Sequence, residues 1–203
     1  MFKNILKAVF AVTVILASNP ASAIECADPK AFVESVRDSV LAVIKSPASD
    51  TEKQTQLDKA FRDTADTEWM SKFVLGRNYS KLTPEQQAEY SKVYTDFLSA
   101  SYVQRFREYN GDVITVNSVK PNNEDFNVDT TINRPGKAAI NVNYRVHKSG
   151  NCFKVIDVVA EGVSLISTQR QDFTAAFGQR GYDGLIEVLK TKTAQFNSGQ
   201  GDK

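Results

Sequence analysis

Residues 139–147, AINVNYRVH, place Ile140, Val142, Tyr144 and Val146 at alternate positions with polar side chains between them. Successive side chains of a β-strand point to opposite faces of a sheet, so this alternation predicts a strand with one buried face. Three further stretches read as strands, and the turns between them are short: residues 112–120, 125–133 and 152–160. Strands joined by short turns pair antiparallel, so we expect an antiparallel meander.

Helical patterns lie on both sides of these strands. Asp28 and Pro29 suit the cap and first position of a helix, and Ser49 with Glu52 forms a capping box for a second one. We divide the mature chain into a helical part, a sheet and C-terminal helices broken near Gly181, at about residues 28–110, 112–160 and 163–196. This order predicts an α+β fold, with an antiparallel sheet of four strands or more.

The first 23 residues have the pattern of a secretory signal. Lys3 and Lys7 precede an apolar run at residues 8–17, and the small residues Ala21 and Ala23 follow. Ten apolar residues are too few to span a bilayer, which needs about 20. We therefore expect cleavage after Ala23 and export, leaving residues 24–203 as a single domain.

The charged residues nearly balance over the 203 residues, with a formal net charge of +1. Nucleic-acid-binding proteins usually carry a basic excess, so this balance argues against a nucleic-acid partner.

Cys26 and Cys152 are the two cysteines, and in an exported chain an even count favours a structural disulfide. Two free thiols are the alternative that this pattern leaves open.

Little in the sequence indicates catalysis. The one histidine, His147, lies at a polar position of its strand, so we expect it to face solvent rather than act as a general base. Asp157 lies among valines, and a buried carboxylate is costly unless it is paired. We expect Arg145 of the adjacent strand as its partner, and a catalytic acid is the alternative. No histidine and cysteine cluster suggests a metal site.

Three groups of motifs carry a family resemblance. They are residues 75–79 (LGRNY) with 83–86 (TPEQ), residues 101–111 (SYVQRFREYNG), and residues 144–146, 153–158, 161–166 and 169–173 (YRV, FKVIDV, EGVSLI and QRQDF). Together they resemble the MlaC family, also called toluene-tolerance proteins, over about residues 28–192. Members of this family are periplasmic phospholipid carriers of the pathway that maintains lipid asymmetry in Gram-negative bacteria. The cysteines depart from the usual pattern, as does the polar Gln169.

The resemblance implies a cystatin-like curved sheet that encloses, with the helices, an apolar cavity for acyl chains. It implies a carrier with no catalytic residues and no cofactor other than the phospholipid cargo. It also implies two docking partners, an inner-membrane ABC transporter complex with an MCE-domain subunit and an outer-membrane lipoprotein–porin complex. We expect a monomer. A small periplasmic enzyme that uses Asp157 or His147, and an interaction module without ligand, are the alternatives.

Apolar patterning, weighted by the resemblance, predicts the residues that line such a cavity. They are Trp69, Phe73, Phe97, Tyr102, Phe106, Val142, Tyr144, Val146, Val155, Leu165, Ile166 and Phe173. Arg145 and Arg170 are weaker candidates, for the lip of the cavity or for structural roles. The same apolar residues would also suit an ordinary filled core.

Overall fold

The computed structural model describes residues 24–107 and 109–200, so the predicted signal peptide, residues 1–23, lies outside the described residues. The helices are α1 (Pro29–Lys45), α2 (Asp50–Thr64), α3 (Thr67–Leu75), the 3-10 helix η1 (Gly76–Lys81), α4 (Pro84–Arg107) and α5 (Leu165–Asn197). The strands are β1 (Val113–Asn122), β2 (Asp125–Asn133), β3 (Ile140–Ser149), β4 (Cys152–Ala160) and β5 (Val163–Ser164). The predicted α+β class is confirmed. None of the described helices has the length and apolarity needed to cross a membrane.

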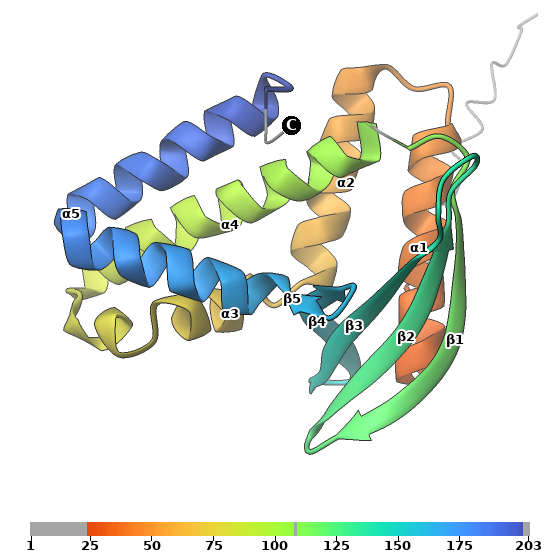
Figure 1. Ribbon diagram of the computed structural model, residues 1–203, viewed down its shortest axis with the longest axis horizontal. Helices are drawn as coiled ribbons and strands as arrows, with labels where there is room; N and C mark the ends of the chain where they lie inside the picture. Colours follow the sequence, from red (N-terminus) through yellow and green to blue (C-terminus); the bar gives the residue numbers. More distant parts are fainter. Residues whose placement is uncertain (1–23, 108, 201–203) are drawn as a thin grey trace, which may run out of the picture.

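The five strands form one antiparallel sheet in the order β1-β2-β3-β4-β5, which confirms the meander (Figure 1). The alternation in β3 gives the sheet its apolar face. Val142 lies opposite Thr130 of β2, and Tyr144 lies opposite Val128 of β2 and Val158 of β4. Directly paired residues share a face, so the apolar positions of neighbouring strands form one continuous surface.

β4 contains a bulge that the sequence pattern did not reveal. The register shifts between Arg145 and Val146 of β3, which pair with Asp157 and Val155. One residue of β4, Ile156, is therefore extra, and both it and Asp157 are buried. The bulge explains why the β4 sequence lacks the clean alternation of β3.

The helices pack in two ways around this sheet (Figure 1). α1 lies on the apolar face, where Phe32 and Val33 pack against Val116, Val128 and Val146; we call this cluster the sheet core. The helices α3, α4 and α5 form a second cluster beyond β4, which we call the helical core. Its fully buried members are Val74, Leu75, Tyr90, Tyr94, Leu185 and Leu189. A small third cluster joins α1, α2 and α4.

The predicted helix boundaries agree with the caps of the structure. The Asp28 carboxylate accepts hydrogen bonds from the Lys30 and Ala31 amides at 2.8 and 2.9 Å, and Ser49 with Glu52 forms the capping box. The two predicted C-terminal helices are the two halves of α5, which bends at Gly181. Gly181 has φ +68°. Glycine adopts this conformation readily, whereas it is unfavourable in free energy for a residue with a Cβ atom.

A disulfide joins Cys26 to Cys152, which confirms the predicted bridge. It connects the segment before α1 to the start of β4, across a sequence separation of 126 residues. A crosslink that closes so long a loop restricts the unfolded chain and thereby stabilises the folded one.

The double variant Cys26→Ser/Cys152→Ser should lower the free energy of unfolding by about 2–5 kcal/mol, because it releases that loop. Urea unfolding of the oxidised wild type and the variant measures the difference. Thiol titration of the unreduced, denatured wild type should find no free thiol. Two free thiols per chain would contradict the bridge.

Candidate functional site

Eight of the twelve predicted lining residues lie in or against the two cores. Phe97, Ile166 and Phe173 are buried in the helical core, and the stacked rings of Trp69 and Phe73, with centroids 5.1 Å apart, lie half-buried at its margin. In the sheet, Val142 and Val146 are buried, while Tyr144 and Val155 are half-buried against the sheet core. Leu165 is half-buried at the start of α5. The twelve residues therefore do not form one continuous cluster, and their contact with a ligand stays a prediction.

Aromatic side chains connect the helices to the sheet at one place. Tyr102 of α4 packs against Phe61 of α2 and Phe106 of α4, with ring centroids 5.2 and 4.8 Å away. The hydroxyl of Tyr144 on β3 lies close enough to the Tyr102 hydroxyl for each phenol to affect the pKa of the other. We call these four residues the aromatic junction. The predicted lining includes three of them and leaves out Phe61, which lies on the mostly polar helix α2.

The predicted Arg145–Asp157 pair is wrong. Arg145 instead donates from Nε and Nη2 to Asp125 of β2, at 2.9 and 2.5 Å. Asp157 accepts hydrogen bonds from the Ser164 hydroxyl at 2.6 Å and the Ile166 amide at 3.2 Å, so this buried carboxylate satisfies the first turn of α5. Arg145 and Asp157 are directly opposite each other on neighbouring strands. This position alone does not determine the direction in which a long arginine side chain extends.

His147 is not the solvent-facing residue that its position in β3 predicted. Its Nε2 lies 2.9 Å from Oδ2 of Asp66, and its ring packs edge-on against Trp69. Asp66 also caps α3 by accepting from the Trp69 amide at 2.9 Å, and its own amide donates to the Val155 carbonyl at 2.9 Å. His147 and Asp66 thus join the helices to β4 and β3, and sequence reasoning missed Asp66 in this role.

Arg170 has a structural role. Its Nη1 donates to the Phe73 carbonyl at 3.0 Å, and its guanidinium lies over the Phe73 ring, 4.8 Å from the centroid. A Cβ atom at Gly76 would come within 3.0 Å of this guanidinium, and Gly76 has φ +53°. The LGRNY motif therefore needs its glycine for two reasons, a left-handed backbone and the space that Arg170 occupies.

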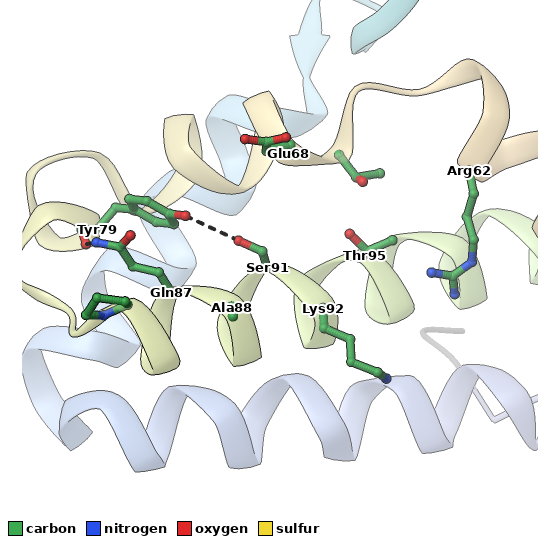
Figure 2. A pocket seen from close by; sticks show the side chains of 10 residues that line it. Arg62, Glu68, Tyr79, Gln87, Ala88, Ser91, Lys92 and Thr95 are labelled. Atoms are coloured by element: carbon green, nitrogen blue, oxygen red, sulfur yellow. Dashed lines mark hydrogen bonds between the residues drawn. The ribbon is translucent and has the colours of Figure 1, made fainter.

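Two surface hollows are lined mainly by polar residues. One, of about 560 Å³, lies between α3, η1 and α4, where the Tyr79 and Ser91 hydroxyls are 3.5 Å apart (Figure 2). The other, of about 420 Å³, lies between α2, α4 and α5. Arg62 borders both. None of the twelve predicted lining residues borders either hollow.

Arg62 is committed to two carboxylates rather than free to bind a ligand. It donates to Asp58 on its own helix and to Asp96 on α4, each at 2.9 Å. Burial opposes the ionisation of Asp96, but hydrogen bonds from Lys92 and Arg62 outweigh it and lower its pKa. The described residues hold no cluster of histidine, cysteine and carboxylate side chains suited to a metal ion.

The variant Asp157→Ala should lower the free energy of unfolding by about 1–3 kcal/mol, because it leaves the buried Ile166 amide without its acceptor. Asp172→Ala, at an exposed position of the same helix, is the matched control and should change stability little. Urea unfolding measures both. Equal effects of the two variants would contradict the structural role of Asp157.

The sequence model of the MlaC protein family matches residues 34–191. The chain is 25% identical to the intermembrane phospholipid transport system binding protein MlaC of Haemophilus influenzae over 133 residues, 63% of this chain and 62% of that protein. It is 25% identical to the toluene tolerance protein ttg2D of Pseudomonas putida over 199 residues, 91% of this chain and 93% of that protein.

A solved structure has the same fold. It is the phospholipid-binding protein from Ralstonia solanacearum in complex with a phospholipid, with a TM-score of 0.74 and 27% identity. The similarity covers 84% of this chain and 99% of that one, so it includes both the helices and the sheet. The family match extends over most of the same residues, from α1 into the second half of α5. The chain belongs to the MlaC family.

Proposed function

We propose that this protein is the binding protein of an intermembrane phospholipid transport system, a carrier rather than an enzyme. The observation that carries the proposal is the family match over residues 34–191. The similarity of the whole fold to a phospholipid-bound structure supports it. The two residues that offered the best case for catalysis, Asp157 and His147, are both engaged in holding helices to the sheet.

The physical need for such a carrier follows from the cost of exposing acyl chains to water. Each methylene that leaves an apolar environment costs about 0.8 kcal/mol. Two chains of about 15 methylenes each therefore cost about 24 kcal/mol to expose. A carrier that replaces one apolar environment by another removes most of this cost without any covalent chemistry.

The lipid site that we propose lies between the apolar face of the sheet and the helices, around the aromatic junction. The acyl chains contact the twelve residues predicted from the sequence, and the head group points to solvent. Half-buried side chains such as Tyr102, Phe106 and Tyr144 present their accessible surface to the chains, while buried ones such as Val142 and Val146 form the floor. The apolar face of a curved, cystatin-like sheet supports this arrangement because it is continuous across β1 to β4.

The protein acts in the periplasm after cleavage of its signal peptide at Ala23. The Cys26–Cys152 disulfide supports this location, because such bonds persist in oxidising compartments. The Haemophilus influenzae relative is named as the binding protein of an intermembrane phospholipid transport system, and this name supports the same role here. Accordingly, the carrier docks as a monomer on an inner-membrane ABC transporter complex with an MCE-domain subunit and on an outer-membrane lipoprotein–porin complex.

Native mass spectrometry of gently purified protein tests the carrier function. A carrier should retain phospholipid, and the lipid should be identified by its mass after dissociation. The protein should also take up phospholipid from vesicles. Repeated recovery of ligand-free protein that takes up no lipid would contradict the proposal and favour an interaction module with a filled core.

The variant Val142→Trp should lower phospholipid occupancy severalfold, because it adds a large ring to the apolar face opposite Thr130 and Ala160. Asn141→Trp places the same ring on the opposite face of β3, where Asn141 is exposed, and should leave occupancy unchanged. Native mass spectrometry measures occupancy, and circular dichroism checks the fold. Unchanged occupancy in Val142→Trp would contradict the proposed lining.

A further inference from the structure

The larger of the two surface hollows, between α3, η1 and α4, has no part in the proposed lipid site. None of the twelve predicted lining residues borders it. Two motifs of the sequence meet there instead, because Tyr79 of LGRNY and Pro84 of TPEQ both line its wall. The side chains of this hollow are therefore available for a ligand other than the acyl chains.

A chain of hydroxyls runs from the wall of the hollow into the protein, and its direction follows from counting protons. Each hydroxyl has one proton to donate. The buried Ser71 donates to the Glu68 carbonyl at 2.8 Å, so Ser91, whose hydroxyl is 3.2 Å away, donates to Ser71. Tyr79 is then the donor in the long contact of 3.5 Å between its hydroxyl and that of Ser91. Ser91 and Tyr79 therefore offer the hollow only acceptor oxygens.

Gln87 is also left with an acceptor. Both protons of its Nε2 are donated to backbone carbonyls, those of Tyr79 and Leu82, at 3.1 and 3.2 Å. Its Oε1 can only accept. Figure 2 shows Tyr79, Gln87 and Ser91 grouped on one side of the hollow, which we call the acceptor end. A group that binds there has to bring several hydrogen-bond donors.

The cations that border the hollow are engaged by carboxylates of their own. Arg62 donates to Asp58 and Asp96, and Lys92 donates to Asp96 at 2.8 Å. Figure 2 shows Arg62 at the end of the hollow remote from the acceptor end. An anion entering the hollow would have to compete with these carboxylates, so the lining disfavours an anionic ligand.

A carboxylate adds negative charge to the wall of the hollow. Glu68 of α3 borders it and is exposed. Its one ion pair is with Lys72 on the same helix, at 2.6 Å, and such exposed pairs contribute little free energy. A carboxylate accepts from several donors at once, so Glu68 remains able to bind a second cation.

We propose that the acceptor end receives an arginine side chain of a partner protein on which the carrier docks. This inference rests on the proposed carrier function. A guanidinium carries five N–H donors and no acceptor, which complements the oxygens of Tyr79, Gln87 and Ser91. The Tyr79 ring offers a face on which a guanidinium stacks, and Pro84 offers apolar surface to the aliphatic stem.

An arginine within a protein chain suits the hollow better than the free amino acid does. Free arginine brings a carboxylate as well as a guanidinium. The cations that could bind this carboxylate, Arg62 and Lys92, already donate to Asp58 and Asp96. An arginine in a polypeptide supplies the same donors without the carboxylate, so we assign the hollow to protein docking.

An NMR titration of the isotope-labelled mature protein tests the proposal. The probe is acetyl-arginine methylamide, which represents an arginine within a chain. Signals of Tyr79, Gln87 and Ser91 should shift saturably. Free arginine, acetyl-lysine methylamide and acetyl-citrulline methylamide should each bind about fivefold more weakly, the ratio expected from the loss of about one hydrogen bond. Citrulline replaces the guanidinium by an uncharged urea that carries an acceptor oxygen.

Charge substitutions at the border of the hollow test the sign of the interaction. Ala88 is exposed on α4 and lines the hollow. Ala88→Lys should weaken binding of the arginine probe about fivefold, and Ala88→Glu should strengthen it. Ser91→Ala should weaken it as well, because it removes an acceptor. Thr55→Lys is the control, because it adds the same charge at an exposed position of the other hollow, and it should leave the affinity unchanged.

Four results would overturn the assignment. They are the absence of saturable shifts at the acceptor end, equal binding of the citrulline or lysine probe, tighter binding of free arginine than of the blocked probe, and equal affinities in Ala88→Lys and Thr55→Lys. Phospholipid uptake from vesicles is measured on the same samples. A wild type that binds the arginine probe but takes up no lipid would contradict the carrier function. One that takes up lipid but does not bind the probe would overturn this inference alone.

Discussion

Two carboxylates at β4 hold the helices of this protein to its sheet. Asp66 caps α3, bonds to His147 of β3 and anchors its own amide on the Val155 carbonyl of β4. Asp157, buried in the β4 bulge, accepts from Ser164 and Ile166 where α5 begins. A buried carboxylate is tolerated only where such partners are present, so these two residues determine where α3 and α5 begin relative to the strands.

The placement of these bonds explains how apolar surface is distributed in the molecule. Because polar bonds hold α3 and α5 at β4, the helical core forms beyond that strand rather than over the sheet (Figure 1). α1 covers the apolar face of the strands instead, and the disulfide joins the segment before it to β4. At the aromatic junction, Tyr102 of α4 lies close to Tyr144 of β3.

Much of this structure was predictable because local physics determines it. The alternation of β3 predicted the apolar face, and Ser49 with Glu52 and the turn at Gly181 predicted helix boundaries that the structure confirms. The Cys26–Cys152 bond was predictable because a signal-like N-terminus implied an oxidising compartment. The errors concern long-range polar partners. The partners of His147 and Arg145 were predicted from strand position alone. Their actual partners, Asp66 and Asp125, depend on which helices and strands pack next to them.

By itself, the sequence determined the class of the fold, the antiparallel order of its strands, the export pattern and the family, because periodicity, caps and motifs are properties of short stretches. Only the tertiary structure decided which apolar residues share a core. Phe97 and Val146 look alike in a sequence, yet one packs among helices and the other against α1 and the sheet. The physical reason is that the burial of a residue depends on which helices and strands pack against it. Here the bulge in β4 and the carboxylates of Asp66 and Asp157 determine that packing.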